Sequence, residues 1–225
     1  VDLEIDSGEI VALVGPSGAG KTSLLRLMAG SLMADAGTAS FGGKNLAQLA
    51  PAALRAARSR IGFVHQDHPL VPILRAHQNV IAGALGQRGF WSAARSMIRP
   101  TSEDLDRAHR LLGRVGIPEK LCLRTDSLSG GQQQRVAIAR ALFQAPLALL
   151  ADEPVASVDP TRARAVLALM KEVAKERGLT LVASLHDITL ARELFPRLVG
   201  LRAGRLVFDS PTAKVHDDAL EALYR

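Results

Sequence analysis

Cysteine, aromatic residues and long hydrophobic runs are all scarce in this sequence. Among 225 residues there is one cysteine, Cys122, and aromatic residues make up 4% of the chain. A single cysteine excludes an internal disulfide and fits a reducing compartment, and because no metal-binding partner stands nearby we expect Cys122 to be a packing residue. No apolar run approaches the ~18–20 residues needed to cross a bilayer, and no segment has the pattern of a signal peptide. Any role at a membrane should therefore be peripheral.

The residues that are abundant favour an α/β fold. Hydrophobic residues make up 48% of the chain, and alanine, leucine and valine are frequent. This composition suits helices packed on a buried, mainly parallel sheet. We expect strands at residues 1–6, 10–14, 61–64, 147–151 and 179–185, a small antiparallel element within 37–45, and a hairpin of 198–201 with 206–208. Helices are expected at residues 51–58, 105–115, 130–143 and 160–177, with a helical tail from 211 to 225.

The order of these elements predicts one domain over residues 1–225 with an insertion. Residues 1–66 and 123–225 should form the α/β core, and helical spacing without strands predicts a helical subdomain over residues 67–122 that continues into the helix from Gly130. Thr101 is expected to begin a helix there with a capping box. The chain starts abruptly within the first expected strand and without an initiator methionine, so it looks like a fragment that lacks its first residues.

A glycine-rich loop at residues 15–22 follows the second expected strand and precedes an apolar helical pattern. That context makes G-x-x-x-x-G-K-[ST] a phosphate cradle, because glycines let successive N–H groups point at one anion and the new helix adds its positive end. Lys21 is expected to reach the β- and γ-phosphates of a nucleotide, and the Thr22 hydroxyl to hold Mg²⁺. The residues expected to contact the nucleotide are Gly15, Pro16, Ser17, Gly18, Ala19, Gly20, Lys21, Thr22 and Ser23.

Two acids follow the apolar run 147–151. Asp152 and Glu153 should lie at the carboxyl end of a strand, where open α/β sheets bind their ligands. Asp152 is the expected second contact to Mg²⁺, usually through water. Glu153 could polarise an attacking water as a general base.

A second anion site is indicated at residues 128–132. Ser129 is a good N-cap, and Gly130 and Gly131 expose the backbone at a helix start ahead of Gln132. A single γ-phosphate does not need two cradles from one chain. The simplest solution is a two-fold dimer in which this helix end closes on the nucleotide held by the partner's loop.

These motifs together resemble the nucleotide-binding subunits of ATP-binding cassette (ABC) transporters over essentially the whole chain. Residues 15–22 match the family's Walker A motif, 128–132 its signature and 147–153 its Walker B. Gln66 matches the Q-loop, Ser157-Val-Asp159 the D-loop and His186 the switch histidine. The other histidines match no motif and are expected to be surface or packing residues: His65, His68, His77, His109 and His216.

The resemblance implies a P-loop NTPase core and two cassettes that sandwich two ATP molecules head to tail with Mg²⁺. Glu153, His186 and Gln66 would then be catalytic, with Gln66 also sensing the metal, and Asp159 would lie at the nucleotide with the signature. The family also stacks an aromatic residue on adenine from a loop upstream of residue 1, and no residue before Gly15 can replace it. We therefore expect weaker ATP binding by this chain than by a longer one.

The resemblance further implies an ATPase of a bacterial importer, bound to permease subunits on the cytoplasmic face of the inner membrane and indirectly to a solute-binding protein. Residues 79–86, Phe90-Trp91 and Leu223-Tyr-Arg225 resemble the phosphonate-import subfamily, although importers of other oxyanions or solutes remain alternatives. The net charge of +6 invites a nucleic-acid or lipid partner, but residues 55–60, its densest basic stretch, have no interleaved aromatics and favour a solvated or membrane-side face. DNA repair and translation ATPases of the same superfamily are the remaining alternatives; we expect no nucleic-acid partner, because residues 67–127 are too short for a coiled-coil insertion and the chain holds one cassette.

Overall fold

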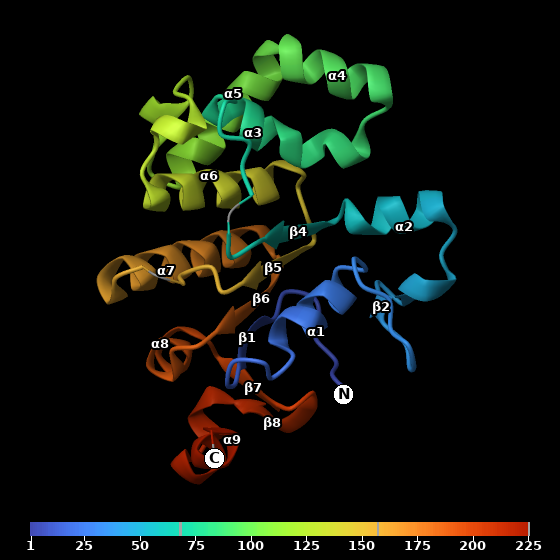
Figure 1. Cartoon of the computed structure of the whole chain (residues 1–225), viewed down its shortest axis with the longest axis vertical. Helices are drawn as coiled ribbons and strands as arrows, with labels where there is room; N and C mark the ends of the chain where they lie inside the picture. The colour runs from blue at the N-terminus through green and yellow to red at the C-terminus, as the bar shows by residue number, and fades with distance from the viewer. Residues whose placement is uncertain (68, 157, 225) are drawn as a thin grey trace.

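The computed structural model describes residues 1–67, 69–156 and 158–224 and confirms the predicted α/β fold (Figure 1). Six strands form one sheet in the order β4-β5-β6-β1-β7-β8. All neighbours are parallel except β7 and β8, which form the antiparallel hairpin expected at the sheet edge. The strands are β1 (Ile10–Val14), β4 (Ile61–Val64), β5 (Ala148–Asp152), β6 (Thr180–Leu185), β7 (Arg197–Arg202) and β8 (Arg205–Pro211).

Helices cover this sheet and build the upper part of the molecule in Figure 1. The small antiparallel pair β2 (Ser40–Phe41) and β3 (Lys44–Asn45) lies beside the main sheet, as the sequence predicts. Short 3₁₀ turns connect several elements. The helices are α1 (Lys21–Met28), α2 (Pro51–Arg58), α3 (Ala76–Ile81), α4 (Phe90–Ile98), α5 (Ser102–Arg114), α6 (Gly130–Phe143), α7 (Pro160–Arg177), α8 (Ile188–Leu194) and α9 (Asp217–Tyr224).

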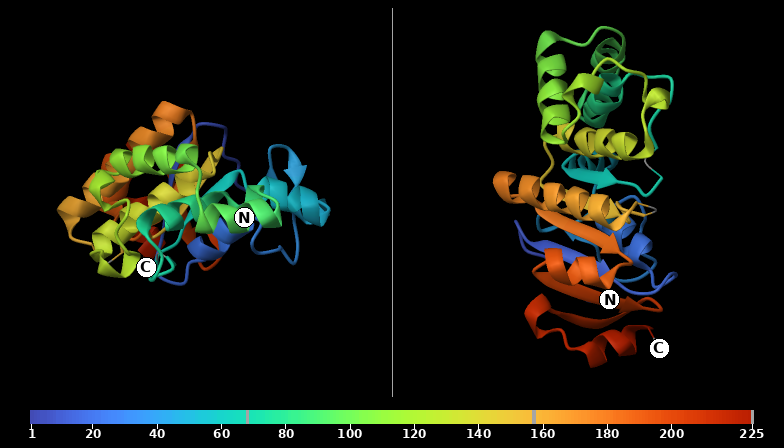
Figure 2. Two further views of the ribbon diagram at one scale, coloured as in Figure 1. Left: turned by 90° about the horizontal axis from the view of Figure 1, so that it is seen from above. Right: turned by 90° about the vertical axis from the view of Figure 1, so that its left-hand side faces the viewer.

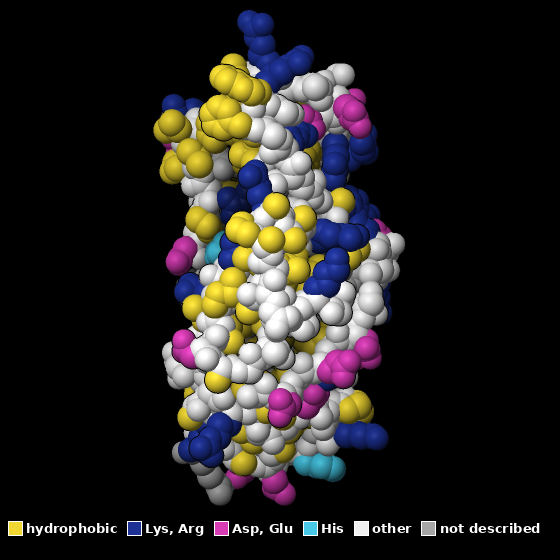
Figure 3. All heavy atoms as spheres, turned by 90° about the vertical axis from the view of Figure 1, so that its right-hand side faces the viewer, with side chains coloured by type: hydrophobic (Ala, Val, Ile, Leu, Met, Phe, Trp, Pro, Cys, Tyr) yellow, Lys and Arg dark blue, Asp and Glu magenta, His cyan; other side chains and the backbone are white. Residues whose placement is uncertain are grey.

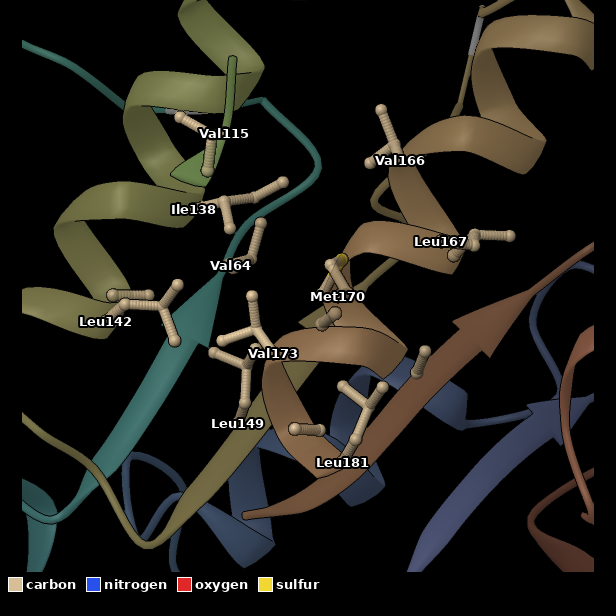
Figure 4. Packing of buried hydrophobic residues seen from close by; sticks show 14 of the residues in the cluster. Val64, Val115, Ile138, Leu142, Leu149, Val166, Leu167, Met170, Val173 and Leu181 are labelled. Atoms are coloured by element: carbon tan, nitrogen blue, oxygen red, sulfur yellow. The ribbon is translucent and has the colours of Figure 1, made fainter. Parts of the chain in front are cut away.

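One apolar core joins the helices of residues 76–143 to the sheet. Its buried members include Val115 between α5 and α6, Ile138 on α6, Leu149 on β5 and Met170 on α7. Figure 4 shows Val115 and Ile138 above Val64, with Met170 beside them on the neighbouring helix. Figure 2 shows the same stacking from the side, with the upper helices next to the edge strand β4 and α7 lying across one face of the sheet. Packed side chains therefore hold the helical part against the sheet, and this packing sets the position of α6 relative to the strands.

Local signals explain most helix ends. Asp159 caps α7 by accepting a hydrogen bond from the Arg162 amide, and Gly178 ends that helix in the left-handed conformation at φ 62°. Thr101 caps α5 by accepting from the Asp104 amide. The other half of the expected capping box is absent, because the Asp104 carboxylate instead pairs with Arg88 at 2.6 and 3.0 Å.

Two predictions from the sequence are wrong, and one helix was missed. Residues 1–6 form no strand. Leu3 and Ile5 nevertheless pack against the core cluster that contains Val11 and Leu13 of β1. The alternation of apolar and polar residues therefore reflects the burial of every second side chain, without hydrogen bonds to a neighbouring strand. Cys122 is exposed and does not pack in the core. Helix α8 was not expected, because its seven residues are too few to show a clear helical period.

The basic stretch around α2 is anchored to the backbone. Arg55 donates to the Gly86 carbonyl at 3.0 Å, and Arg58 donates to the Gly30 carbonyl at 2.9 Å. In the described residues no helix is both long enough and apolar enough to cross a membrane.

Candidate nucleotide site

The site lies at the edge of the sheet where the parallel strands β1, β4, β5 and β6 all end. The register pairs Val14 with Leu185 and Asp152 with Ser184, so the loops that follow these strands start at the same level. Parallel strands present their carboxyl ends together, and that is where open α/β sheets bind ligands. The glycine-rich loop, Asp152, Glu153 and His186 are brought together in this way.

The glycine-rich loop has no room for larger side chains at its first position. Gly15 has φ 149°, and a Cβ built there would lie 2.0 Å from the Leu201 carbonyl oxygen. Gly20 has φ 101° and is the N-cap of α1, so the amides at the start of this helix point into the loop. Glycine is therefore required by the geometry that turns the backbone N–H groups toward an anion.

Lys21 is buried within this loop, with 4% of its surface exposed. Its ammonium donates to the carbonyls of Gly15 at 2.7 Å and Pro16 at 3.1 Å. Burial lowers the pKa of Lys21, and the carboxylates of Glu153 and Asp152 oppose that shift. A cation held this way has backbone carbonyls as its partners, which an anionic ligand could replace.

Asp152 accepts two hydrogen bonds on one oxygen. The Thr22 hydroxyl donates to Asp152 Oδ1 at 3.0 Å, and the Ser184 hydroxyl donates to the same atom at 2.9 Å. Asp152 is 6% exposed, so these hydroxyls are its main compensation for lost hydration. Of the three residues expected at Mg²⁺, Thr22, Gln66 and Asp152, the first and last are thus in direct contact.

Glu153 is held in an unusual backbone conformation beside His186. Its φ is 46°, a left-handed value that costs a non-glycine residue about 1–2 kcal/mol. The Glu153 amide donates to the Ser184 hydroxyl at 2.8 Å, and its carboxylate contacts His186 Nε2. Backbone strain of this kind persists only where surrounding contacts hold the residue in place. At Glu153 the strained conformation directs the carboxylate toward the glycine-rich loop.

A cavity of about 350 Å³ lies between these groups. Gln66, which follows β4 as predicted, is among the residues that line it. The lining residues are Ser17, Gly18, Ala19, Gly20, Lys21, Thr22, Ser23, Gln66, Glu153 and His186. Every predicted catalytic residue therefore faces one hollow, together with seven of the residues expected to contact the nucleotide.

The signature residues are not part of this cavity. Ser129 begins α6, and it forms a full capping box: its hydroxyl accepts from the Gln132 amide at 3.4 Å, and the Gln132 side chain accepts from the Ser129 amide at 3.0 Å. Gly130 and Gly131 form the first turn of the same helix, and no atom lies within 4 Å of a Cβ built on either. Among the described residues Asp159 also lies outside the cavity lining and caps α7.

The remaining histidines have the roles predicted for them where the structure describes them. His77 is buried and its Nδ1 contacts the Leu121 carbonyl at 2.9 Å, whereas His109 and His216 are exposed. His65 is also exposed and lies 4.4 Å from the Phe63 ring. His68, Ser157 and Arg225 were also named from the sequence and lie outside the described residues.

Two residues at the site were missed by the sequence analysis. Ser184 is fully buried and joins Asp152 to the Glu153 backbone. The signal for it was a serine in the otherwise apolar run before His186. Tyr224, at the end of α9, reaches the loop from the far end of the chain: burial raises its pKa, and a hydrogen bond from the Gly15 backbone acts in the opposite direction. No local pattern connects Tyr224 to Gly15.

Comparisons with known proteins show the family to which the chain belongs. A family model described as ABC transporter matches residues 1–156. The chain is 49% identical over its whole length to the phosphonates import ATP-binding protein PhnC 2 of Pseudomonas aeruginosa, covering 83% of that relative, and 45% identical to PhnC 1 of Rhodopseudomonas palustris, covering 79%.

Solved structures show the same architecture. The post-hydrolysis dimer of the ATP-binding cassette MJ0796 bound to ADP and Pi aligns with a TM-score of 0.80 and 31% identity, covering 94% of this chain and 89% of that one. CbiO1 of Clostridium perfringens, part of the transporter complex cbiONQ, aligns with a TM-score of 0.81 and 28% identity over 95% of this chain and 81% of its own. The chain belongs to the ABC transporter family, as one of its ATP-hydrolysing cassettes.

Proposed function

We propose that this cassette hydrolyses ATP at the cavity beside Lys21 to drive import of phosphonate through a separate membrane permease. The observation that carries the ATPase part is the contact of Glu153 with Ser184 and His186 directly beside the glycine-rich loop. Phosphonate is supported by relatives that are named phosphonate importers and are 42–49% identical over the whole chain.

Each side chain has a defined task in that reaction. The amides of the loop hold the phosphates, and Lys21 would exchange its carbonyl partners for β- and γ-phosphate oxygens. Glu153 orients a water for in-line attack on the γ-phosphorus and accepts its proton as the bond to the β-phosphate oxygen breaks. His186 holds the Glu153 carboxylate and faces the γ-phosphate position.

The oxygens of Thr22 and Asp152 fit Mg²⁺. They are hard donors 3.0 Å apart at the loop, one of them a carboxylate, and Mg²⁺ is usually held by one or two such groups plus substrate phosphates and water. Among the described residues no cluster of three acid, histidine or cysteine side chains could hold a metal alone, so the triphosphate would have to supply further ligands. When bound, Mg²⁺ would neutralise charge on the phosphate oxygens.

A second copy of the chain would complete the site. Ser129 and the open first turn of α6 form an anion-binding helix start that the cavity of the same chain does not use. In a head-to-tail dimer this helix start would close on the nucleotide of the partner, with Asp159 nearby. The dimeric MJ0796 cassettes, at 31–32% identity, support this arrangement.

The exposed apolar side chains of residues 71–98 are the proposed docking surface for the permease. Phe90 and Trp91 are 77% and 83% exposed at the start of α4, and Ile98 at its end is 79% exposed. Val71 and Ile73 are also exposed, on the loop after Gln66. Figure 3 shows hydrophobic side chains gathered on the upper part of one face, over the helical part of the chain. Such a surface on a chain that works beside a membrane permease would place it at the cytoplasmic face of the membrane.

The test uses a bacterium that lacks its own phosphonate-import ATPase and carries the permease and binding protein. Expression of this chain should restore growth on methylphosphonate as the only phosphorus source, and the purified chain should hydrolyse ATP. Glu153→Gln should abolish growth and slow hydrolysis severely, yet retain MgATP and accumulate as a dimer. If the purified chain hydrolyses ATP but its expression does not restore growth, the proposal that phosphonate is the solute is wrong. If Glu153→Gln hydrolyses ATP at the unchanged rate, the proposed role of Glu153 is wrong.

A further inference from the structure

A second hollow, of about 510 Å³, lies away from the nucleotide site, between α5 and the end of α7. Figures 1 and 2 show α5 in the upper, helical part of the molecule and α7 below it, against the sheet. Guanidinium groups dominate the lining of this arginine cavity. Its residues are Arg107, Arg110, Leu111, Gly113, Arg114 and Arg177.

The arginines approach from two elements. Arg107, Arg110 and Arg114 stand at positions i, i+3 and i+7 of α5, so they share one face of that helix. Arg177 is in the last turn of α7. The negative end of α7 accounts for Arg177 alone, but it does not account for three further cations on the facing helix.

Nearby acids compensate only part of this charge. Arg114 pairs with Glu172 at 3.7 Å and with Glu176, and Arg107 lies 4.6 Å from the centre of the Phe143 ring and donates to the Phe143 carbonyl. Within residues 1–67, 69–156 and 158–224, Arg110 and Arg177 have no ion pair and no side-chain hydrogen bond.

The electrostatic environment of Arg177 also indicates uncompensated positive charge around the arginine cavity. Burial lowers its pKa, and the charges of Arg107 and Arg114 lower it further, while Glu176 opposes them. Cations that repel one another around a hollow are stabilised by an anion placed between them. Guanidinium groups are suited to this because their paired N–H donors match the oxygens of phosphate and similar groups.

We propose that the arginine cavity binds a small, multiply charged oxyanion of the phosphate class, which links α5 of the helical part to α7 of the core. Arg110 and Arg177 supply donors that no other described residue uses, one from each element. A bound anion therefore resists separation of α5 from α7. This site is independent of the nucleotide site, which lies at the carboxyl edge of the sheet.

The experiment measures inorganic phosphate binding by calorimetry at constant ionic strength. Saturating Mg²⁺ and a non-hydrolysable ATP analogue occupy the glycine-rich loop, and a Lys21→Ala background provides the same measurement with that loop impaired. We expect one phosphate per chain in both backgrounds. Arg110→Gln combined with Arg177→Gln should weaken phosphate binding at least 10-fold.

The matched control is Arg95→Gln with Arg99→Gln, which removes the same charge from exposed positions at the end of α4 outside the cavity. It should bind phosphate like the unchanged chain. No binding by the unchanged chain, or equal weakening in both double variants, would overturn the proposal. If the cavity variant does not fold, Arg177→Lys keeps the charge and removes the forked donors. Weaker phosphate binding by Arg177→Lys supports the site, and unchanged binding refutes it.

Discussion

Replacing Ser184 by alanine tests how much its hydroxyl contributes to stability and to catalysis, because the change leaves the neighbouring motif residues Asp152, Glu153 and His186 in place. Ser184 is fully buried, donates to Asp152 Oδ1 at 2.9 Å and accepts from the Glu153 amide at 2.8 Å. A hydrogen bond to a charged group contributes about 1.5–3 kcal/mol, and a buried amide left unpaired costs about 1–3 kcal/mol. Because Thr22 still donates to Asp152, we expect Ser184→Ala to lower the free energy of unfolding by about 2–4 kcal/mol.

The same change should reduce catalysis. Ser184 fixes both the carboxylate expected to hold Mg²⁺ and the backbone that presents Glu153. Loss of a group that orients metal ligands typically costs about 10–100-fold in activity or metal affinity. We therefore expect kcat for ATP hydrolysis to fall by about 10–100-fold, and the Mg²⁺ concentration for half-maximal rate to rise.

Two measurements on the same samples check this: urea denaturation for stability, and steady-state hydrolysis across a Mg²⁺ series for function. The matched control is Ser96→Ala, which removes a buried hydroxyl that bonds the Ala93 carbonyl at 2.8 Å within α4, far along the chain from the site. Ser96→Ala should lose some stability and keep its kcat. If folded Ser184→Ala hydrolyses ATP at the unchanged rate, the argument that Ser184 positions Asp152 and Glu153 is wrong.

Three further changes test other contacts. Lys21→Ala should remove the only ammonium that lines the nucleotide cavity in the described residues and abolish productive ATP binding; nucleotide retention equal to that of the unchanged chain in equilibrium dialysis would contradict this. Gly15→Ala places a Cβ 2.0 Å from the Leu201 carbonyl, so ATP affinity and the melting temperature should both fall, whereas Gly86→Ala, which meets no atom within 4 Å, should change neither. Asn79→Ala loses hydrogen bonds to both backbone groups of Val71 and to Thr125, so unfolding measured in urea should be easier by about 2–4 kcal/mol; an unchanged denaturation midpoint would show that these bonds contribute little.

Much of the fold could be predicted because local and tertiary signals agree. The apolar run of β1, the glycines of the loop and the helical spacing of α1 all occur within 20 residues, and each demands the same geometry. The proline after Asp159 and the glycine after Arg177 likewise mark the two ends of α7. Such elements depend on nearby residues, which a sequence displays directly.

The errors arose where the outcome depends on distant neighbours. Residues 1–6 alternate like a strand, but the described chain pairs β1 with β6 and β7, and no neighbour forms a ladder with residues 1–6. The exposure of Cys122 follows from the short turn that carries it over the surface, and one cysteine has no partner whose spacing could reveal this. Ser184 and Tyr224 could not be linked to the site because the link depends on the β5–β6 register and on where α9 packs.

Hydrogen bonds between segments far apart in the sequence connect the loop after Gln66 to the segment before Ser129. Through these bonds a change at the nucleotide cavity can affect the signature residues. Residues 72 and 74, which follow the Gln66 loop, accept hydrogen bonds from the amides of Asp126 and Thr125, and Asn79 joins Val71 to Thr125 through its side chain. Thr125 stands four positions before Ser129, so the loop after β4 and the segment that leads into α6 form one hydrogen-bonded unit. A nucleotide that displaces Gln66 must therefore also move the start of α6, or break buried hydrogen bonds at a cost of about 1–3 kcal/mol each. We therefore expect ATP bound at the glycine-rich loop to shift the start of α6, which carries Ser129.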